Sequence, residues 1–431
     1  MSTDPAAVVL ARWASELRCA DLPPDVVDAA ERHLIDAVGC AVAGIRRGAA
    51  DPALTVARSL GGPPEAQLFT GERLGAVAAA FGNAVAVHAL DFDDTHPGGL
   101  VHASAVNVPV ALAVGAAASA DELITALVAG METVCRLGAA VPHGFHARGL
   151  HATSICGPVA AAVVAGKLLG LDAPTLTAAI GIAASGASGL LEFLHSPAGT
   201  KQLHPGTAVA NGILAARLAA AGATGPAGAL DGAYGLYRAL ADRQPDRDTL
   251  LGGLGSRWET TGIAVKPYPC CQLSHASLDA ARPFAGSEPG TQAGAVTVTL
   301  HPAAVPIVAE EPKRRPRSAY EAKFSVYFGV AAMIIDGRVD LDTFDHLDRP
   351  DLLELAARIT VRTRDAGGVP ADAPGDVEVE GHRSIVDRAA GPGVRDKAAA
   401  NLGAGAHAVF AAVDSRAGAA ALLDAIEGCL T

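Results

Sequence analysis

The sequence predicts a mainly α-helical protein with a large all-α domain and a smaller α+β lid domain. From residue 5 to about 262, apolar and small residues recur at helical spacing in long Ala-rich blocks. Alternating, strand-like runs occur only between residues 290 and 382. From about residue 395 the pattern is helical again. We therefore expect a helical domain at 1–264, an α+β lid domain at 265–392, and C-terminal helices at 393–431 that return to the helical domain.

Apolar spacing, glycines and a proline divide the helical part into separate predicted helices. The first has Leu34, Ile35, Val38 and Val42 at helical spacing. Small-residue blocks predict further helices at 76–90, 104–120, 155–170, 174–193 and 206–221. Gly170 and Gly222 lie where a left-handed residue ends a helix, and Pro205 lies where a first turn tolerates proline. So much Ala and Gly predicts helices that pack closely.

The α+β part is predicted from three period-two runs and one helix. The runs are 296–300, 359–362 and 377–380. Between them, Glu321 to Ile335 predicts one helix closed by Gly337. Pro-rich loops at 302–316 and 367–375 separate these pieces.

Composition excludes several classes of protein. The 431 residues carry 33 basic and 45 acidic side chains, a net charge of −12, and only 4% aromatics. Nucleic-acid binders need a basic face, and single-strand binders need aromatic platforms, so neither is expected. The longest apolar stretch, Val108 to Ala120, is too short for a bilayer, which needs about 20 residues. The N-terminus lacks the pattern of a signal peptide, and seven scattered cysteines fit a reducing compartment. We expect a cytoplasmic protein with no membrane partner.

Histidines gather in the part of the sequence where chemistry is expected. Six of the fourteen lie between residues 88 and 151. Basic or proton-carrying residues also precede four predicted helices. They are His102, His151, the pair Lys201 and His204, and His275. Helix N-termini favour anions, so convergence of these ends would form a small electropositive pocket suited to a substrate with several carboxylates. Taken singly, each residue could instead be a simple cap or a surface side chain.

Other kinds of site are not supported by the sequence. The acidic run Asp91, Asp93, Asp94 could bind a hard cation, but the glycine turn and distant Glu of such sites are missing. Cys270, Cys271 and His275 do not have zinc-site spacing. Phosphate-loop, dinucleotide and nucleophile-elbow motifs are absent. We therefore expect no metal site.

Five segments together resemble the MmgE/PrpD family, whose members include 2-methylcitrate dehydratase, cis-aconitate decarboxylase and iminodisuccinate epimerase. They are HALDFDDTH (88–96), GLHATSICGPVAAAVVAGKLLGL (149–171), GTKQLHPGTAVANGILAARLAAAGATGP (199–226), KPYPCCQLSHASLDA (266–280) and AKFSVYFGVAAMIIDGRV (322–339). The resemblance implies a helical domain with an α+β lid, a pocket between them, a homodimer, and activity without cofactor or metal. The catalytic and substrate-binding residues that it implies are Asp91, Thr95, His102, His151, Lys201, Lys266 and His275.

Two departures from the family pattern bear on the substrate. Ala103-Ser104 follows His102 where the family usually has Pro-Ser, and Tyr320 lies only near the position of a lid tyrosine found in some members. Our leading hypothesis is dehydration of a 2-methylcitrate-like hydroxy acid. The alternatives are decarboxylation of a cis-aconitate-like acid, epimerisation of an imino- or amino-dicarboxylate, and an inactive carboxylate-binding homologue.

General acid/base chemistry assigns a role to each implied residue. Lys201 would stabilise the developing negative charge, and His151 and His275 would transfer protons. His102 would bind or protonate the substrate, and Asp91 would orient a histidine. Thr95 would donate a hydrogen bond to a carboxylate, and Lys266 would bind substrate.

Overall fold

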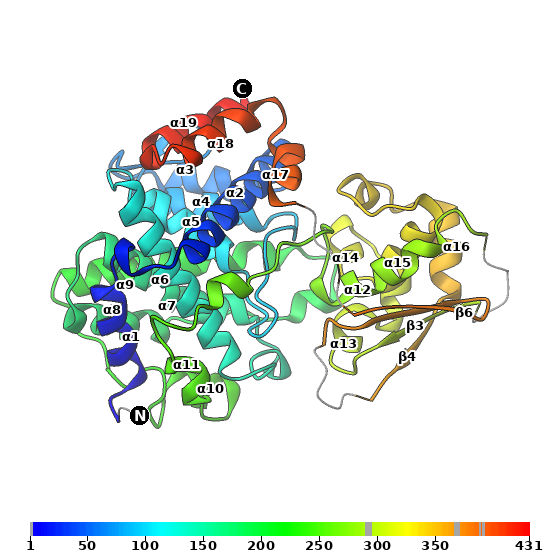
Figure 1. Ribbon diagram of the computed structural model, residues 1–431, viewed down its shortest axis with the longest axis horizontal. Coiled ribbons are helices and arrows are strands. Elements are labelled where there is room, and N and C mark those ends of the chain that lie inside the picture. The colour runs from blue at the N-terminus through cyan, green and yellow to red at the C-terminus, as the bar shows by residue number, and fades with distance from the viewer. Residues whose placement is uncertain (1–2, 289–294, 366–370, 388, 390–392) are drawn as a thin grey trace.

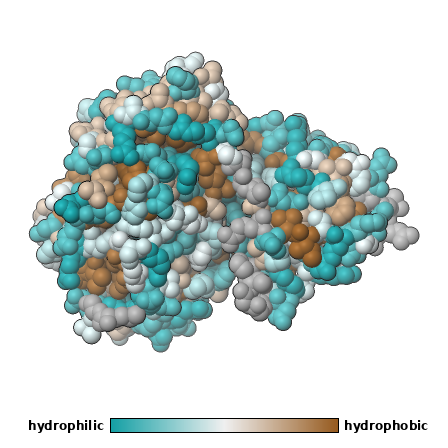
Figure 2. All heavy atoms as spheres, in the orientation of Figure 1, coloured by the Kyte–Doolittle hydropathy of each residue, from teal (hydrophilic) through white to brown (hydrophobic). Residues whose placement is uncertain are grey.

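The computed structural model describes residues 3–288, 295–365, 371–387, 389 and 393–431. It confirms the predicted fold class, because a large body of helices adjoins a smaller body built around one sheet (Figure 1). The face seen in Figure 2 is mostly hydrophilic, with apolar patches over both bodies. Within the described ranges, no helix has both the length and the hydropathy needed to cross a membrane.

The larger body consists of helices packed at short distance. They are α1 (Ala6–Glu16), α2 (Pro24–Arg46), α3 (Asp51–Leu60), α4 (Ala76–His88), α5 (Ala103–Val114), α6 (Ala120–Ala139), α7 (Ala152–Leu168), α8 (Ala173–Ser185), α9 (His204–Ala220), α10 (Leu236–Ala241) and α11 (Arg247–Leu251). A Cβ added at Gly212 of α9 would lie 2.3 Å from the Ala161 Cβ of α7. Glycine at this contact therefore allows the two backbones to approach closely, as the composition predicted.

The C-terminal helices share the core of this larger body. They are α17 (Val394–Leu402), α18 (Ala406–Asp414) and α19 (Gly418–Leu430). Leu402 and Ile426 are buried in the same apolar cluster as Val38 of α2. In Figure 1 these three C-terminal helices lie beside α2, which comes from the N-terminal part of the sequence.

The smaller body holds a four-stranded sheet with the order β4-β3-β5-β6. Its strands are β3 (Val296–Leu300), β4 (Thr360–Thr363), β5 (Gly375–Val379) and β6 (His382–Val386). β4 runs parallel to β3, whereas β5 is antiparallel to both β3 and β6. The longer helices here are α12 (Gln272–Ala281), α15 (Val326–Asp336) and α16 (Pro350–Arg358), and α13 (Val305–Val308) and α14 (Ala319–Ala322) are short. This body has a separate apolar core that includes Val298, Phe328 and Leu355.

Several predicted boundaries were wrong. The helix predicted from Glu321 to Ile335 is divided between α14 and α15 by a break at 323–325. Ser325 caps α15, because its hydroxyl accepts a hydrogen bond from the Phe328 N–H. The predicted helices at 104–120 and 174–193 end early, at Val114 and Ser185. β6 was not predicted, nor were the two-residue strands β1 (Ala66–Gln67) and β2 (Arg73–Leu74) in the larger body.

One segment of the larger body packs into the core of the smaller one. Phe193, between α8 and α9, belongs to the apolar cluster of the smaller body. Lys313 donates to the Leu194 carbonyl at 3.0 Å, and Ser318 donates to the Pro197 carbonyl at 3.1 Å. Arg47, just after α2, forms an ion pair with Asp345 at 2.6 Å. These contacts bring the walls of the site together.

A buried lysine fastens the C-terminal segment to the region of the site. Lys397 of α17 forms an ion pair with Asp36 of α2 at 2.8 Å and donates to the Phe92 carbonyl at 2.6 Å. We expect Lys397→Met to lower the free energy of unfolding by about 3–5 kcal/mol, because it leaves the buried Asp36 carboxylate without its cation. Chemical denaturation measures the change. The control is Arg395→Met on the same helix as Lys397, which removes a half-exposed pair with Asp414 of α18 and should cost less than about 1 kcal/mol. Equal losses in the two variants would contradict this.

Candidate active site

The loop between α4 and α5 carries Asp91 in a left-handed conformation. Its φ is +52°, which is uncommon outside glycine and tolerated best by Asp and Asn. Side-chain donors from later in the sequence hold the carbonyls of this loop in place. Lys266 Nζ donates to the Asp91 carbonyl at 2.9 Å, Lys397 to that of Phe92, and His102 Nδ1 to that of Asp94 at 2.8 Å. The strained turn is thus fixed by side chains that follow it in the sequence.

Three of the helix starts singled out in the sequence meet at one pocket. His102 is the N-cap residue of α5 and His151 that of α7. Lys201 lies in the short 3₁₀ turn Thr200–Leu203 directly before α9. All three line a pocket between the two cores. The other lining residues are Asp91, Thr95, Leu100, His146, Leu191, Phe193, Leu194, Lys266, Cys271, Gln272, Leu273, Ile307 and Phe324.

Two lysines share one carboxylate in this pocket. Asp91 Oδ1 lies 2.5 Å from Lys201 Nζ and 3.1 Å from Lys266 Nζ. Burial alone would raise the pKa of Asp91, but the two lysines outweigh it and hold that pKa well below its usual range. The other oxygen, Oδ2, is buried and has no hydrogen-bond partner among the described residues. Among the residues that line the pocket, two lysines therefore face one carboxylate.

His102 is held as a neutral imidazole. Its Nδ1–H donates to the Asp94 carbonyl, so its Nε2 carries a lone pair, which faces Lys201 Nζ at 3.3 Å. Burial and the nearby lysine charge both lower the pKa of His102 well below its usual value. Thr95 Oγ1 lies 3.3 Å from the same Nδ1. Lys201 therefore bridges Asp91 and His102 within the pocket.

His151 is paired with a second histidine. Its Nδ1 lies 3.0 Å from Nδ1 of His204, the first residue of α9, so one ring donates and the other accepts. Burial, then the charge of Lys201, lowers the pKa of His151. The pKa of His204 is lowered to about 4, mainly by burial. With His204 as acceptor, a protonated His151 could keep its second N–H for a ligand.

Asp93 orients a histidine, a role that the sequence analysis gave to Asp91. Both Asp93 oxygens lie 2.9 Å from Nδ1 of His88, the last residue of α4. The His88 ring packs edge-on against His102, with centroids 4.5 Å apart. Asp91 instead bonds lysines. His88 and Asp93 were not predicted as site residues, although their five-residue spacing at the end of a predicted helix was visible.

Three imidazoles could in principle ligate a metal. Ring nitrogens of His88, His102 and His151 all lie within 4.8 Å of one another, and so do ligand atoms of His88, Asp91, Asp93 and His102. However, the lone pair of His102 Nε2 already faces a lysine ammonium at 3.3 Å, and that ammonium would repel a cation. The present arrangement therefore fits an anion better than a metal. Independence from metals and cofactors stays a prediction.

The structure does not bring His275 to the pocket surface. α12 begins at Gln272, so His275 lies inside its first turn rather than before it. Its side chain is buried and donates from Nε2 to the Cys270 carbonyl at 3.0 Å. Tyr320 is also buried and has no hydroxyl partner among the described residues, but its ring packs on the lining residue Phe324 with centroids 5.7 Å apart. Lys266 and Thr95 do line the pocket.

Two models of one protein family together match most of this chain. The family model of the MmgE/PrpD N-terminal domain matches residues 8–248, and that of the C-terminal domain matches residues 268–380. The chain belongs to the MmgE/PrpD family. The cis-aconitate decarboxylase of Aspergillus terreus is 30% identical over 378 residues, which cover 81% of this chain and 77% of that protein. The human cis-aconitate decarboxylase is 30% identical over 302 residues, covering 67% and 61%. The cis-aconitate decarboxylase-like protein oryM of Aspergillus oryzae is 28% identical over 366 residues, covering 78% and 74%.

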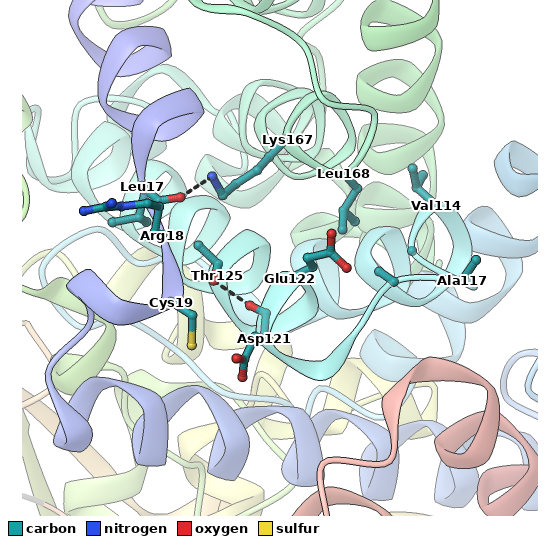
Figure 3. Close-up of a pocket in the computed structure, with 12 residues that line it drawn as sticks. Leu17, Arg18, Cys19, Val114, Ala117, Asp121, Glu122, Thr125, Lys167 and Leu168 are labelled. Atoms are coloured by element: carbon teal, nitrogen blue, oxygen red, sulfur yellow. Dashed lines mark hydrogen bonds between the residues drawn. The ribbon is translucent and has the colours of Figure 1, made fainter.

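A larger pocket of this MmgE/PrpD protein, about 510 Å³, is not the site (Figure 3). Polar side chains of this pocket form hydrogen bonds that stabilise the surrounding helices. Lys167 donates to the carbonyls of Ala14 and Leu17, at 2.8 and 2.6 Å. Glu122 belongs to the capping box of α6, and Thr125 donates to the Asp121 carbonyl. Arg18 pairs with Asp21, and Asp121 lies 3.4 Å from Arg416, so the charged side chains of this hollow already have partners within the fold.

The lowered pKa values of two pocket histidines predict that anion binding depends on pH. His102 and His151 are neutral when it is empty, and a bound carboxylate would raise their pKa values toward neutrality. Binding of propane-1,2,3-tricarboxylate should therefore take up protons, and its Kd should fall as the pH drops from 8 to 6. Calorimetry at pH 7 in buffers of different ionisation enthalpy measures the uptake. A Kd independent of pH, with no proton uptake, would contradict this.

Proposed function

We propose that this MmgE/PrpD-family lyase decarboxylates a cis-aconitate-like tricarboxylic acid. The observation that carries the proposal is the position of Lys201, a buried cation beside Asp91 and His102 in a pocket that His151 and Lys266 also line. The relatives found are named as cis-aconitate decarboxylases or proteins like them, which supports decarboxylation among the reactions of the family. They favour this alternative over dehydration of a 2-methylcitrate-like acid, our leading hypothesis from the sequence.

The proposed reaction needs charge stabilisation and one proton. The bond between a substrate carbon and one carboxylate breaks, CO₂ leaves, and the electron pair stays on the substrate. There it spreads over the neighbouring double bond and a remaining carboxylate, until one proton restores a neutral carbon. Lys201 and Lys266 stabilise the negative charge, because a fixed cation acts strongly in a site that excludes water. The net change is loss of CO₂ and gain of one proton.

His151 is our candidate for the proton donor. It lines the pocket, and its Nδ1 is engaged by His204, which leaves Nε2 as the atom that can deliver a proton. His102 is the second candidate, because transfer of the Lys201 ammonium from its Nε2 to a substrate carboxylate would free that nitrogen to hold a proton. Thr95 and Lys266 bind carboxylates in this scheme, and Asp91 positions the two lysines.

The test is a screen of substrates with two independent readouts. Purified protein is incubated with cis-aconitate, 2-methylcitrate and an amino-dicarboxylate, while CO₂ release and the proton NMR spectrum are followed. We expect CO₂ only from cis-aconitate, in equal amount to a new unsaturated dicarboxylate, and unchanged activity with EDTA. Loss of water from 2-methylcitrate without CO₂ would restore the dehydration hypothesis, and binding of all acids without turnover would indicate an inactive homologue.

The family resemblance also leads us to propose a cytoplasmic homodimer. Close packing through small-residue helix faces is compatible with association of two copies. Sedimentation velocity at micromolar concentration tests this, and a monomer there would contradict it.

A further inference from the structure

His146 lines the pocket but has no part in the proposed chemistry. It begins the short 3₁₀ turn His146–Arg148 between α6 and α7. The neighbouring Phe145 is buried and stacks on Tyr237, with ring centroids 6.0 Å apart. Phe145 thus anchors the turn from behind. The imidazole of His146 forms no hydrogen bond with any described residue, so its two nitrogens are left for whatever enters the pocket.

The polar groups of this pocket are arranged unevenly. Both lysines contact the single carboxylate of Asp91, so the fixed charges gather at one place. Thr95, His102, His151 and Gln272 add polar groups, and the rest of the wall is largely apolar, including Leu191, Leu194 and Ile307. A substrate with several carboxylates cannot place all of them on one pair of lysines. A carboxylate that lies away from the lysines needs a separate donor, because an unpaired charge on an apolar wall is strongly disfavoured.

We propose that His146 is a specificity-determining residue that binds one carboxylate of a tricarboxylate whose others are held near Lys201 and Lys266. The substrate class rests on the proposed function. The pKa of His146 is lowered to about 4, first by burial and then by the charges of His143 and Lys201. His146 is therefore neutral before the ligand binds, and its N–H can donate a hydrogen bond. A bound carboxylate raises that pKa and permits a charge-assisted hydrogen bond.

A dicarboxylate should not need this residue. Its two charges would be held by Lys201 and Lys266, where attraction is greatest, and His146 would stay without a partner. Selectivity for three carboxylates over two then arises at His146, because a site built to hydrogen-bond a group discriminates against ligands that lack it.

The experiment compares binding of two unreactive acids by calorimetry. The probes are propane-1,2,3-tricarboxylate and pentanedioate, which lacks only the central carboxylate. His146→Leu should weaken binding of the tricarboxylate by at least about tenfold while changing that of the dicarboxylate less than about twofold. His146→Gln, which keeps a donor, should restore part of the loss. His143→Asn is the matched control, because His143 lies outside the pocket lining and has a φ of +56° that Asn tolerates.

The readout separates this proposal from the proposed reaction. If wild-type protein binds the tricarboxylate but releases no CO₂ from cis-aconitate, the reaction is wrong, while selective loss in His146→Leu still supports the role of His146. Equal weakening of both acids, or no weakening of either, in a folded His146→Leu protein overturns the role of His146. If that variant does not fold, His146→Ala decides, because it also removes the donor: a loss confined to the tricarboxylate supports the proposal, and unchanged affinity for both acids overturns it.

Discussion

Replacing His151 by glutamine is expected to lower kcat for CO₂ release by about 10²–10⁴-fold, the usual contribution of a positioned proton donor. Glutamine has similar reach and can still meet the nitrogen of His204, but it cannot carry a transferable proton. Because the lysines remain, KM should change much less than kcat. Steady-state kinetics on the acid that the substrate screen identifies, with circular dichroism to verify folding, measures both.

Two further variants make the result for His151 specific. His204→Gln alters only the partner of His151, so it should give a smaller loss of kcat than His151→Gln and a shifted pH profile. His407→Gln changes an exposed histidine of α18 and should leave the kinetics unchanged. A His151→Gln enzyme with near-normal kcat would remove His151 as the donor and leave His102 as the remaining candidate.

The helix N-termini were the part of the site that the sequence predicted well. His102 and His151 are N-cap residues and Lys201 precedes α9, because caps and first turns are set by a few neighbouring residues. The sequence alone could not show that these three helix ends meet at one pocket, because their meeting depends on how the helices pack. The family resemblance pointed to the same residues, and the structure places them together.

The predictions that failed depended on contacts with distant segments. α12 begins before His275, where the Cys271 N–H is bound by the Lys323 carbonyl at 2.9 Å. The break at 323–325 is held in part by Ser325, whose hydroxyl donates to the Lys313 carbonyl at 2.6 Å. The periodicity of a single segment does not show such distant partners. It therefore predicted one continuous helix from Glu321 to Ile335, and it placed His275 just before a helix instead of inside one.

The exchange of roles between Asp91 and Asp93 has the same origin. Adjacent positions in the sequence could not show which carboxylate faces the lysines and which faces His88. The left-handed turn at Asp91 decides this, because it directs that carboxylate toward Lys201 and Lys266 while Asp93 turns back toward α4. The turn itself depends on donors from Lys266 and Lys397, more than 170 residues away.

Lys201→Met should reduce kcat/KM by at least about 100-fold, equivalent to about 2.7 kcal/mol of transition-state stabilisation. The side chain is buried, bound to Asp91 at 2.5 Å and 3.3 Å from His102, so it is not an ordinary solvated surface charge. Methionine keeps the aliphatic stem and removes the cation that opposes charge build-up on the substrate. Lys201→Arg should restore activity only in part, because a planar guanidinium presents its donors differently from a compact ammonium.

The loss of kcat/KM in Lys201→Met should reflect the missing cation and not misfolding around the Asp91 carboxylate. Lys266 still lies 3.1 Å from that carboxylate, so the variant should remain folded. Adding Asp91→Asn, which tolerates the same φ, tests the coupling: the double variant should lose much less than the product of the two single losses, because the residues act as one unit. Full activity of a folded Lys201→Met enzyme would show that this lysine does not act on the substrate, and fully multiplicative losses would show that Asp91 does not work through it.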